Sequence, residues 1–317
     1  MDGLIDYGKS HEVGQIEFEG DAKYEERIQV GSSSVSNREI EYLQVLQYVF
    51  ECLSPTDKVY ESGRLYLNQK EFITLKPGTF LDSWVIDIFV GILTESEKKK
   101  ATPSNWYLPV MFSTAALVCD EHNFKDFVHR HKMRENYIFD QESPKKVFIP
   151  VHIGQKRHGH FYLYIFHLNK KVVEIWDSLP TFVAETDRDE TTKKLFFAIE
   201  ILFKQKKGAF SDYQTEMANN IRSQDNGFDC GVFVINYMQQ SDNYVKRDSS
   251  FQFNSQKERE DLALKLLNND LNKEKQNLYD KARRHYAHVE KQDGNKRLRV
   301  DPSKEHFEDV GREMEAE

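Results

Sequence analysis

The sequence predicts an α+β domain in which a few adjacent strands lie between two helical regions. Three short runs in the middle of the chain, residues 145–153, 160–168 and 171–178, are rich in Val, Ile, Phe and Tyr, as strands are. Apolar residues on either side of these runs recur every three or four positions, which is typical of helices. Only Asn169 and Lys170 separate the second run from the third, so we expect these two strands to pair as a tight hairpin.

The overall composition is that of a soluble globular protein. Of the 317 residues, 39% are hydrophobic and 30% are charged, and the net charge of -8 disfavours a nucleic-acid partner, which would require a basic face. No apolar run approaches the ~18 residues that span a bilayer, and the first ten residues lack the cationic and apolar regions of a signal peptide. We therefore expect an intracellular monomer that has no membrane partner.

We expect residues 36–275 to form one folded domain between two charged ends. The first 34 residues hold eight carboxylates and three basic side chains, so residues 1–35 are predicted to be disordered. In residues 276–317, 19 of 42 side chains are charged, as in a solvated helix or a disordered tail. The clusters KARR and KRLR within residues 281–299 have the spacing of a bipartite nuclear signal, although a solvated charged segment fits equally well. The expected location is the nucleus, the cytoplasm or both.

Helical patterns account for most of the chain before the central strands. The apolar residues recur at helical spacing there, and two helix starts carry the Ser/Asn-x-x-Glu spacing of a capping box. The predicted elements are a helix over residues 36–54 that opens with Ser36 and Glu39, a short helix that opens with Asn68 and Glu71, an apolar helix from the Pro77-Gly78 turn to Leu93, and a strand that runs into a helix over residues 105–119.

Helices are also predicted after the central strands. A polar stretch that holds Gln224 separates the first of them from the second. The predicted helices are residues 191–205, the apolar run that begins at about Cys230, and residues 255–272, with Leu262, Leu264, Leu266 and Leu267 on the apolar side.

Three cysteines, at positions 52, 119 and 230, are too few and too scattered for a disulfide framework or a Cys-x-x-Cys metal site. Cys52 and Cys119 lie on apolar runs, so we expect them to pack in the core. Cys230 taken alone also fits a small buried hydrophobic residue. It differs from the other two because it opens a predicted helix, where the positive end of the helix dipole favours a thiolate.

Other residues supply the groups that a nucleophilic thiol requires. His160 opens the second central strand and Asp177 closes the third, so pairing of these strands brings both side chains to one edge of the sheet. A histidine held by an acid can take the proton of a thiol. Gln224 and the N–H of Cys230 can donate hydrogen bonds to a developing oxyanion, and Gly231 leaves room for a substrate backbone. Together these residues predict acyl-transfer chemistry at Cys230.

Four segments of the chain resemble one family, the SUMO-specific and related ubiquitin-like-protein cysteine proteases. Its catalytic pattern is matched by HFYLYIF at 160–166, VVEIWDSL at 172–179 and QDNGFDCGVFV at 224–234. Its substrate-contacting segment is matched by LKPGTFLDSWVIDIF at 75–89. The resemblance covers roughly residues 60–270, and several segments in the right order are more specific than any one motif.

The resemblance implies a papain-like cysteine protease fold in circularly permuted order, with a central mixed β-sheet flanked by helices. It implies that His160, Asp177 and Cys230 are a catalytic triad and that Gln224 is the oxyanion donor. The implied activity is that of a thiol protease or isopeptidase, which cleaves after the C-terminal Gly-Gly of a ubiquitin-like modifier during deconjugation or precursor processing. SUMO is the first candidate, and no metal or organic cofactor is implied.

Two departures from the family pattern concern the substrate. Phe80 and Phe161 stand where the family usually has two tryptophans that narrow the channel for the Gly-Gly tail. Phenylalanine keeps an apolar wall but loses area and the indole N–H. Asp82 and Ser83 stand where the family usually has Asn-Asp, so a carboxylate that would meet a basic group on the modifier is shifted. These changes affect the choice of modifier rather than the chemistry.

Three alternatives to this interpretation are weaker. A metal could bind His152, His158, His160 and His167, but neither a thiol nor a second cluster completes a tetrahedral set. An acetyltransferase of the same fold would use acetyl-CoA, and the segment QDNGFDCG fits the protease pattern better. A non-catalytic module that binds a ubiquitin-like protein would not need the complete triad.

Overall fold

The computed structural model describes residues 37–138, 144–154, 159–219, 221–240 and 253–297. The chain divides into two compact units, residues 1–44 and 45–317. The described part of the first unit is the start of helix α2 (Asn37–Glu51), which continues into the second unit. Ser36, the predicted cap of this helix, lies outside the described residues.

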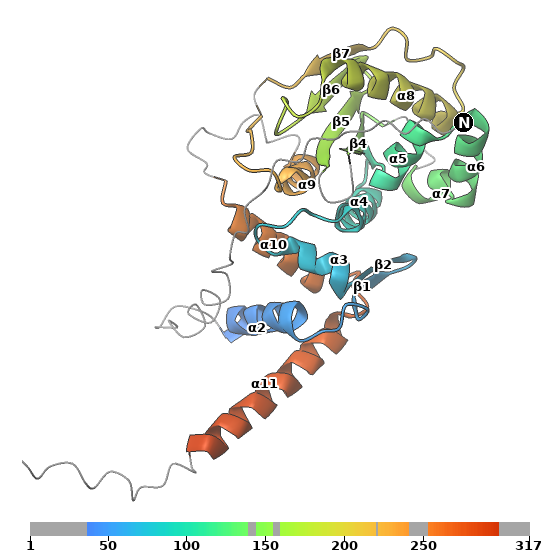
Figure 1. Ribbon diagram of the computed structural model, residues 1–317. Coiled ribbons are helices and arrows are strands. Elements are labelled where there is room, and N and C mark those ends of the chain that lie inside the picture. The colour runs from blue at the N-terminus through green and yellow to red at the C-terminus, as the bar shows by residue number, and fades with distance from the viewer. Residues whose placement is uncertain (1–36, 139–143, 155–158, 220, 241–252, 298–317) are drawn as a thin grey trace, which may run out of the picture. The chain divides into compact units, whose positions relative to one another are not determined.

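The second unit contains all the other described elements (Figure 1). In chain order they are β1 (Lys58–Ser62), β2 (Leu65–Asn68), α3 (Gln69–Phe72), the 3-10 helix η1 (Ile73–Leu75), α4 (Ser83–Lys98), β3 (Asn105–Tyr107), α5 (Val110–Val118), α6 (Glu121–Arg130), α7 (Met133–Tyr137), β4 (Lys146–Ile153), β5 (His160–His167), β6 (Val172–Trp176), α8 (Glu185–Phe203), β7 (Gln214–Met217), α9 (Cys230–Gln240), α10 (Ser255–Asn268) and α11 (Lys275–Arg297).

A five-stranded mixed sheet in the order β3-β4-β5-β6-β7 forms the centre of this unit. The three central strands β4, β5 and β6 are antiparallel to one another, whereas the outer strands β3 and β7 run parallel to β4 and β6, respectively. All eight residues of β5 are buried. The predicted strands and the predicted α+β class are confirmed, and Lys171 closes the β5–β6 hairpin with a positive φ of 56°.

Helices cover both faces of the sheet, and β5 shows which helix covers which face. On one face, the Tyr164 hydroxyl donates a hydrogen bond of 3.1 Å to the carbonyl of Arg188 in α8. On the other face, Phe161 lies beside Gly231 at the start of α9. Because successive residues of a strand point to opposite faces, α8 and α9 pack on opposite sides of β5 (Figure 1). The start of β5 therefore lies next to the start of α9.

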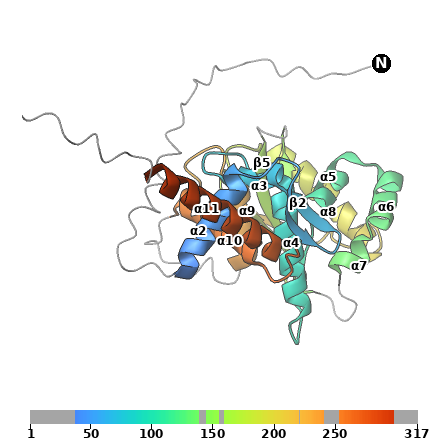
Figure 2. The same ribbon diagram turned by 90° about the horizontal axis from the view of Figure 1, so that it is seen from below.

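Several elements were not predicted from the sequence, among them the helices α6 and α7. Residues 58–68 form a hairpin, β1–β2, that turns at Gly63 with a φ of 58°. Strand β2 runs close beside α4 (Figure 2). Gly91 of α4 permits this close approach, because any side chain there would collide with Leu65 of β2. The edge strand β7 is largely exposed and polar.

Several predicted details hold and others do not. The capping box at Asn68 is confirmed, since its N–H donates to Glu71 Oε2 at 3.1 Å. The core prediction for Cys52 is wrong: it follows the last residue of α2, where the chain turns outward, and its exposed Sγ lies 3.6 Å from His285 Nε2. Cys119, at the C-terminal end of α5, is partly exposed. Leu264 is only half-buried, because α10 turns Arg259 toward the core instead.

The C-terminal segment includes a long helix. The first turns of α11 carry Leu278 and Ala282, and both side chains are buried. Within the described part of the chain, each helix is too short or too polar to cross a bilayer.

Candidate active site

The His160 and Asp177 side chains form a short, buried hydrogen bond. Nε2 of His160 lies 2.6 Å from Oδ1 of Asp177, and both residues are buried. The β5–β6 pairing positions them, because His160 begins β5 and Asp177 directly follows β6. The other nitrogen of the ring, Nδ1, is then left to exchange a proton with a neighbouring group.

Asp177 is held by more than the histidine. Its Oδ1 also accepts a hydrogen bond from the Leu179 N–H at 2.9 Å, and its Oδ2 accepts one from Arg188 Nη2 at 2.9 Å. Burial alone would raise the pKa of this carboxyl. The hydrogen bonds from His160, Leu179 and Arg188 outweigh burial, so the pKa of Asp177 is held below its ordinary value. Asp177 is therefore a fixed, ionised partner for His160.

Cys230 is the first residue of α9 and is buried. Burial raises the pKa of its thiol to about 11, although the N–H groups of Phe161 and Gly231 near the sulfur act in the opposite direction. The contact with Phe161 places the sulfur beside the residue that follows His160. The structure thus pairs the imidazole with the carboxylate and places the thiol beside the backbone of the residue that follows His160. With so high a pKa, the thiol requires a base in order to react near neutral pH.

Gln224 lies on the loop that precedes α9, with its side chain fixed at both ends. Its Oε1 accepts a hydrogen bond from the Ser178 hydroxyl at 2.6 Å, and its Nε2 donates one to the Asn226 carbonyl at 2.6 Å. A backbone bond of 2.8 Å from the Gln224 N–H to the Ser178 carbonyl ties the same loop to the end of β6. These contacts define the orientation of the amide, and the amide group has a second N–H to donate.

An aromatic cluster lies beside the thiol. The rings of Phe80 and Phe161 stack with centroids 5.3 Å apart, and the ring of His152 lies 4.5 Å from Phe161 and 5.9 Å from Phe80. Burial, and the nearby His160, lower the pKa of His152, which favours the neutral imidazole. Gly159 permits this packing, because a side chain there would collide with His152. The two predicted channel positions, Phe80 and Phe161, are therefore neighbours.

The remaining predicted substrate positions have structural tasks of their own. The Asp82 carboxylate caps α4 by accepting the Trp84 N–H at 2.9 Å, and Ser83 is the first residue of that helix. At Gly231, the structure differs from the role that we predicted. A Cβ atom there would lie 2.9 Å from Leu81 Cβ and 3.4 Å from Phe161 Cδ2, so the missing side chain makes room for the protein's own Leu81.

A fully buried ion pair anchors the residue before the nucleophile. Asp229 Oδ1 accepts a hydrogen bond of 2.9 Å from Arg259 Nε, and neither side chain is exposed to solvent. The same guanidinium donates to the Thr74 and Lys76 carbonyls and, through Nη2, to that of Thr79 at 2.8 Å. Arg259 therefore joins the loop that ends at Cys230 to the loop that ends at Phe80.

Three residues of this region were missed from the sequence. Arg188 lies in α8 and Arg259 in α10. Both look like ordinary charged helix residues, and no local pattern reveals that Arg188 is partly buried and Arg259 fully buried. Phe182 follows Pro180, and its ring lies 5.0 Å from the His160 ring while 47% of the residue is exposed. A large apolar residue shortly after the predicted Asp177 was the only available signal for it.

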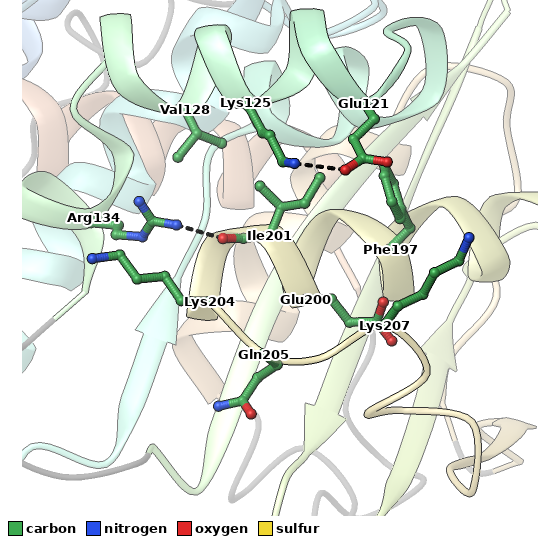
Figure 3. A pocket seen from close by; sticks show the side chains of 10 residues that line it. All are labelled: Glu121, Lys125, Val128, Arg134, Phe197, Glu200, Ile201, Lys204, Gln205 and Lys207. Carbon is green, nitrogen blue, oxygen red and sulfur yellow. Dashed lines mark hydrogen bonds and ion pairs between the residues drawn. The ribbon is translucent and has the colours of Figure 1, made fainter.

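Two further features concern the surroundings of the site: the alternative of a metal site and a cavity outside the predicted catalytic residues. No group of three or more His, Cys, Asp or Glu among the described residues is placed to hold a metal ion; His158, one of the four histidines considered above, lies outside them. A cavity of about 420 Å³ lies between α6 and α8, and its lining side chains are drawn in Figure 3. There, Lys125 pairs with Glu121, and Arg134 donates to carbonyls at the end of α8, including that of Ile201. Its lining lacks cysteine and histidine.

Sequence comparisons identify relatives of this chain. A statistical model described as the Ulp1 protease family, C-terminal catalytic domain, matches residues 85–296. Ubiquitin-like-specific protease 1A of Arabidopsis thaliana is 22% identical over 183 residues, which cover 56% of this chain and 35% of that protein. Sentrin-specific protease 2 of Rattus norvegicus is 26% identical over 207 residues, which cover 63% of this chain and 31% of that protein. The chain thus spans about a third of the length of these curated relatives.

A structural comparison agrees on the fold. The C-terminal Ulp1 protease domain, solved in complex with Smt3, the yeast ortholog of SUMO, superposes with a TM-score of 0.57 at 20% sequence identity. The match covers 76% of this chain and 100% of that domain. At this level of identity the likeness establishes the shared fold.

Proposed function

This chain belongs to the Ulp1 protease family, and we propose that it is a thiol protease or isopeptidase that cleaves after the C-terminal Gly-Gly of a ubiquitin-like modifier. SUMO is the first candidate, in deconjugation, precursor processing or both. The observation that carries the proposal is the short bond between His160 and Asp177 beside the buried thiol of Cys230. The names of the relatives support the same choice of substrate.

In the proposed reaction, His160 Nδ1 takes the Cys230 proton as the sulfur attacks the carbonyl carbon of the last glycine. His160 then gives this proton to the leaving amine as the C–N bond breaks, which leaves a thioester on Cys230. Water, deprotonated by His160, attacks the thioester; the C–S bond breaks, and His160 returns its proton to the Cys230 sulfur. The modifier leaves as a carboxylic acid, which loses its proton to solvent. Asp177 holds the imidazole in one orientation throughout and stabilises its charged form.

The oxyanion of each tetrahedral intermediate requires hydrogen-bond donors that are already in place. We assign this task to the second N–H of the Gln224 amide and to the backbone N–H of Cys230, which has no partner within the first turn of α9. The bonds from Gln224 to Ser178 and Asn226 support the assignment, because they keep the amide from rotating.

The stacked Phe80 and Phe161 rings are the proposed wall of a channel for the Gly-Gly tail. The two rings are stacked against each other and so form one apolar wall. Only glycine has no side chain, so a tail of two glycines can lie closely against this wall. The wall comes from the loop before α4 and from the start of β5. Both lie next to the sulfur, since Phe161 contacts Cys230.

The test of the proposed function is covalent labelling. SUMO that carries a vinyl ester in place of its C-terminal carboxylate should form an adduct with the protein, and Cys230→Ser should abolish the adduct. Cys52→Ser is the matched control, because it removes an exposed thiol and should leave labelling unchanged. Labelling that persists in Cys230→Ser contradicts the assignment. Acetyl transfer from acetyl-CoA without cleavage of any modifier conjugate would favour the acetyltransferase instead.

Arg188 should tune the pH dependence of this reaction. Arg188→Met removes a positive charge from beside Asp177, which raises the pKa of Asp177 and favours the protonated form of the Asp177–His160 pair. We expect the acidic limb of the kcat/KM profile to move upward by roughly half to one pH unit. Arg188→Lys keeps the charge and should restore most of the wild-type profile. A limb that stays in place in Arg188→Met, with only kcat lowered, would mean that Arg188 is merely structural.

The remaining features of the proposal rest on the sequence. A catalytic domain over residues 36–275, with charged segments at 1–35 and 276–317, is proposed from the charge pattern. A nuclear or cytoplasmic location is proposed from the basic clusters within residues 281–299. We also propose that the protein acts as a monomer without a metal or organic cofactor, because the reaction above needs only side chains and water.

A further inference from the structure

We infer that Tyr66 and Trp84 form a docking surface for the globular body of the modifier whose tail enters the channel, and that this surface selects a modifier with an apolar patch at the base of its tail. The inference rests on the proposed function and concerns its substrate. We call the two residues the aromatic pair.

The aromatic pair is exposed although it is large and apolar. Tyr66 is 50% exposed and Trp84 is 43% exposed. Their rings stack with centroids 6.4 Å apart and an interplanar angle of 26°. Contiguous exposed apolar surface is typical of binding sites, and Trp and Tyr are enriched among the residues that dominate binding energy.

The fold holds the aromatic pair in a fixed position. Leu67 of β2 is buried, so its neighbour Tyr66 points to the outer face of the strand. The close approach of β2 to α4, which Gly91 allows at Leu65, brings Tyr66 over the first turn of α4, where Trp84 lies. Because two elements of regular structure present the rings, little side-chain freedom would be lost on binding.

The aromatic pair continues directly from the proposed channel. Trp84 follows the channel residue Phe80 by only four positions, and the chain between them is fixed. The Asp82 N–H donates to Thr74 Oγ1 at 3.0 Å, and the Asp82 carboxylate accepts the Trp84 N–H. A modifier whose tail passes Phe80 must therefore place its body close to Trp84.

The surface formed by the aromatic pair and its neighbours Asp82 and Ser83 is more apolar than acidic. The Asp82 carboxylate is engaged as the cap of α4, and the next residue, Ser83, carries no charge. A basic group on the modifier would find at these two positions a single carboxylate, held at the helix start through its Oδ1, whereas an apolar patch would cover two rings. Apolar contacts are not screened by salt, unlike ion pairs between exposed groups. The inferred partner is thus a modifier whose binding depends little on ionic strength.

The experiment compares two substrates with the same fluorogenic amide at the final glycine: an intact modifier, with SUMO and ubiquitin tested separately, and a peptide of its tail alone. For the modifier that the wild type prefers, Trp84→Ala should raise KM about 10-fold or more and change kcat by less than about twofold. Turnover of the tail peptide should not change. Tyr66→Ala should raise KM by a smaller factor. In the double variant, the loss of binding free energy should be less than the sum of the two single losses, because the rings stack on each other. In about 0.5 M NaCl, the wild-type KM should stay nearly constant.

Val118→Ala is the control, because Val118 is an exposed apolar residue on another helix, α5. An unchanged KM in Trp84→Ala, or an equal loss on the tail peptide, overturns the inference. So does the finding that Trp84→Ala acts only by dissolving a dimer of this chain in ultracentrifugation. If the wild type cleaves no substrate, the proposed function fails separately. Binding of the intact modifiers to Cys230→Ser, with and without Trp84→Ala, then decides the inference: no binding, or equal binding, overturns it.

Discussion

His160→Ala should lower kcat/KM on a ubiquitin-like substrate by about a thousandfold or more. The reason is the environment of Cys230, where burial raises the pKa of the thiol to about 11. At about pH 7.5, such a thiol is ionised in roughly one molecule in three thousand. In the proposed reaction, His160, which is hydrogen-bonded to Asp177, takes the proton during attack and so makes the thiol reactive. Without His160, only the small fraction of molecules in which the Cys230 thiol is already ionised can react.

Alkylation of Cys230 tests this explanation directly. In a Cys52→Ser/Cys119→Ser background, where Cys230 is the single thiol left, iodoacetamide should react with the His160→Ala variant about tenfold faster for each pH unit between roughly 7 and 9.5. The sign follows from the raised pKa, since each step in pH ionises more thiol until the pKa is reached. The same Cys52→Ser/Cys119→Ser background with His160 intact is the control: a base is then present, so alkylation should rise less steeply with pH. A plateau below about pH 9 in His160→Ala would show that the helix start alone ionises the thiol.

The central part of this site could be predicted from the sequence because it depends on local pattern. The runs that became β5 and β6 alternate little and are strongly apolar, so their pairing, and with it the meeting of His160 and Asp177, follows from the short turn between them. Cys230 likewise begins an apolar helix that the pattern indicates. Each of these residues lies at the end of an element, where sequence signals are strongest.

Other parts could not be predicted, because their causes lie far away in the chain. Strand β7 is polar and exposed, and only its pairing with β6 makes it a strand. The β1–β2 hairpin had a signal in Gly63, between two short runs with strand-forming residues, and it was missed because the runs are so short. Arg188 and Arg259 look like solvated helix charges. Their carboxylate partners are distant in the chain: Asp177 lies eleven positions before Arg188, and Asp229 lies thirty positions before Arg259.

Arg259→Met should lower the free energy of unfolding by about 3–5 kcal/mol, because it leaves Asp229 as a buried charge without its partner. The variant also leaves the carbonyls of Thr74, Lys76 and Thr79 without the hydrogen bonds that Arg259 donates. The midpoint of thermal unfolding should fall by roughly 10 °C. Lys125→Met is the matched control, since it breaks an exposed ion pair with Glu121 and should lower the stability far less than Arg259→Met does.

The same arginine should also affect binding of the substrate, and a milder change separates the two effects. Arg259→Lys keeps a positive charge near Asp229 but has too few donors for all the carbonyls that the guanidinium reaches. It should fold at a temperature between those of the wild type and Arg259→Met. Because Arg259 joins the loop before Phe80 to the loop before Cys230, loosening of this joint should raise KM for the intact modifier in the folded variant. Equal midpoints for Arg259→Met and Lys125→Met would contradict the buried role of the pair, and an unchanged KM in Arg259→Lys would mean that Phe80 keeps its position without it.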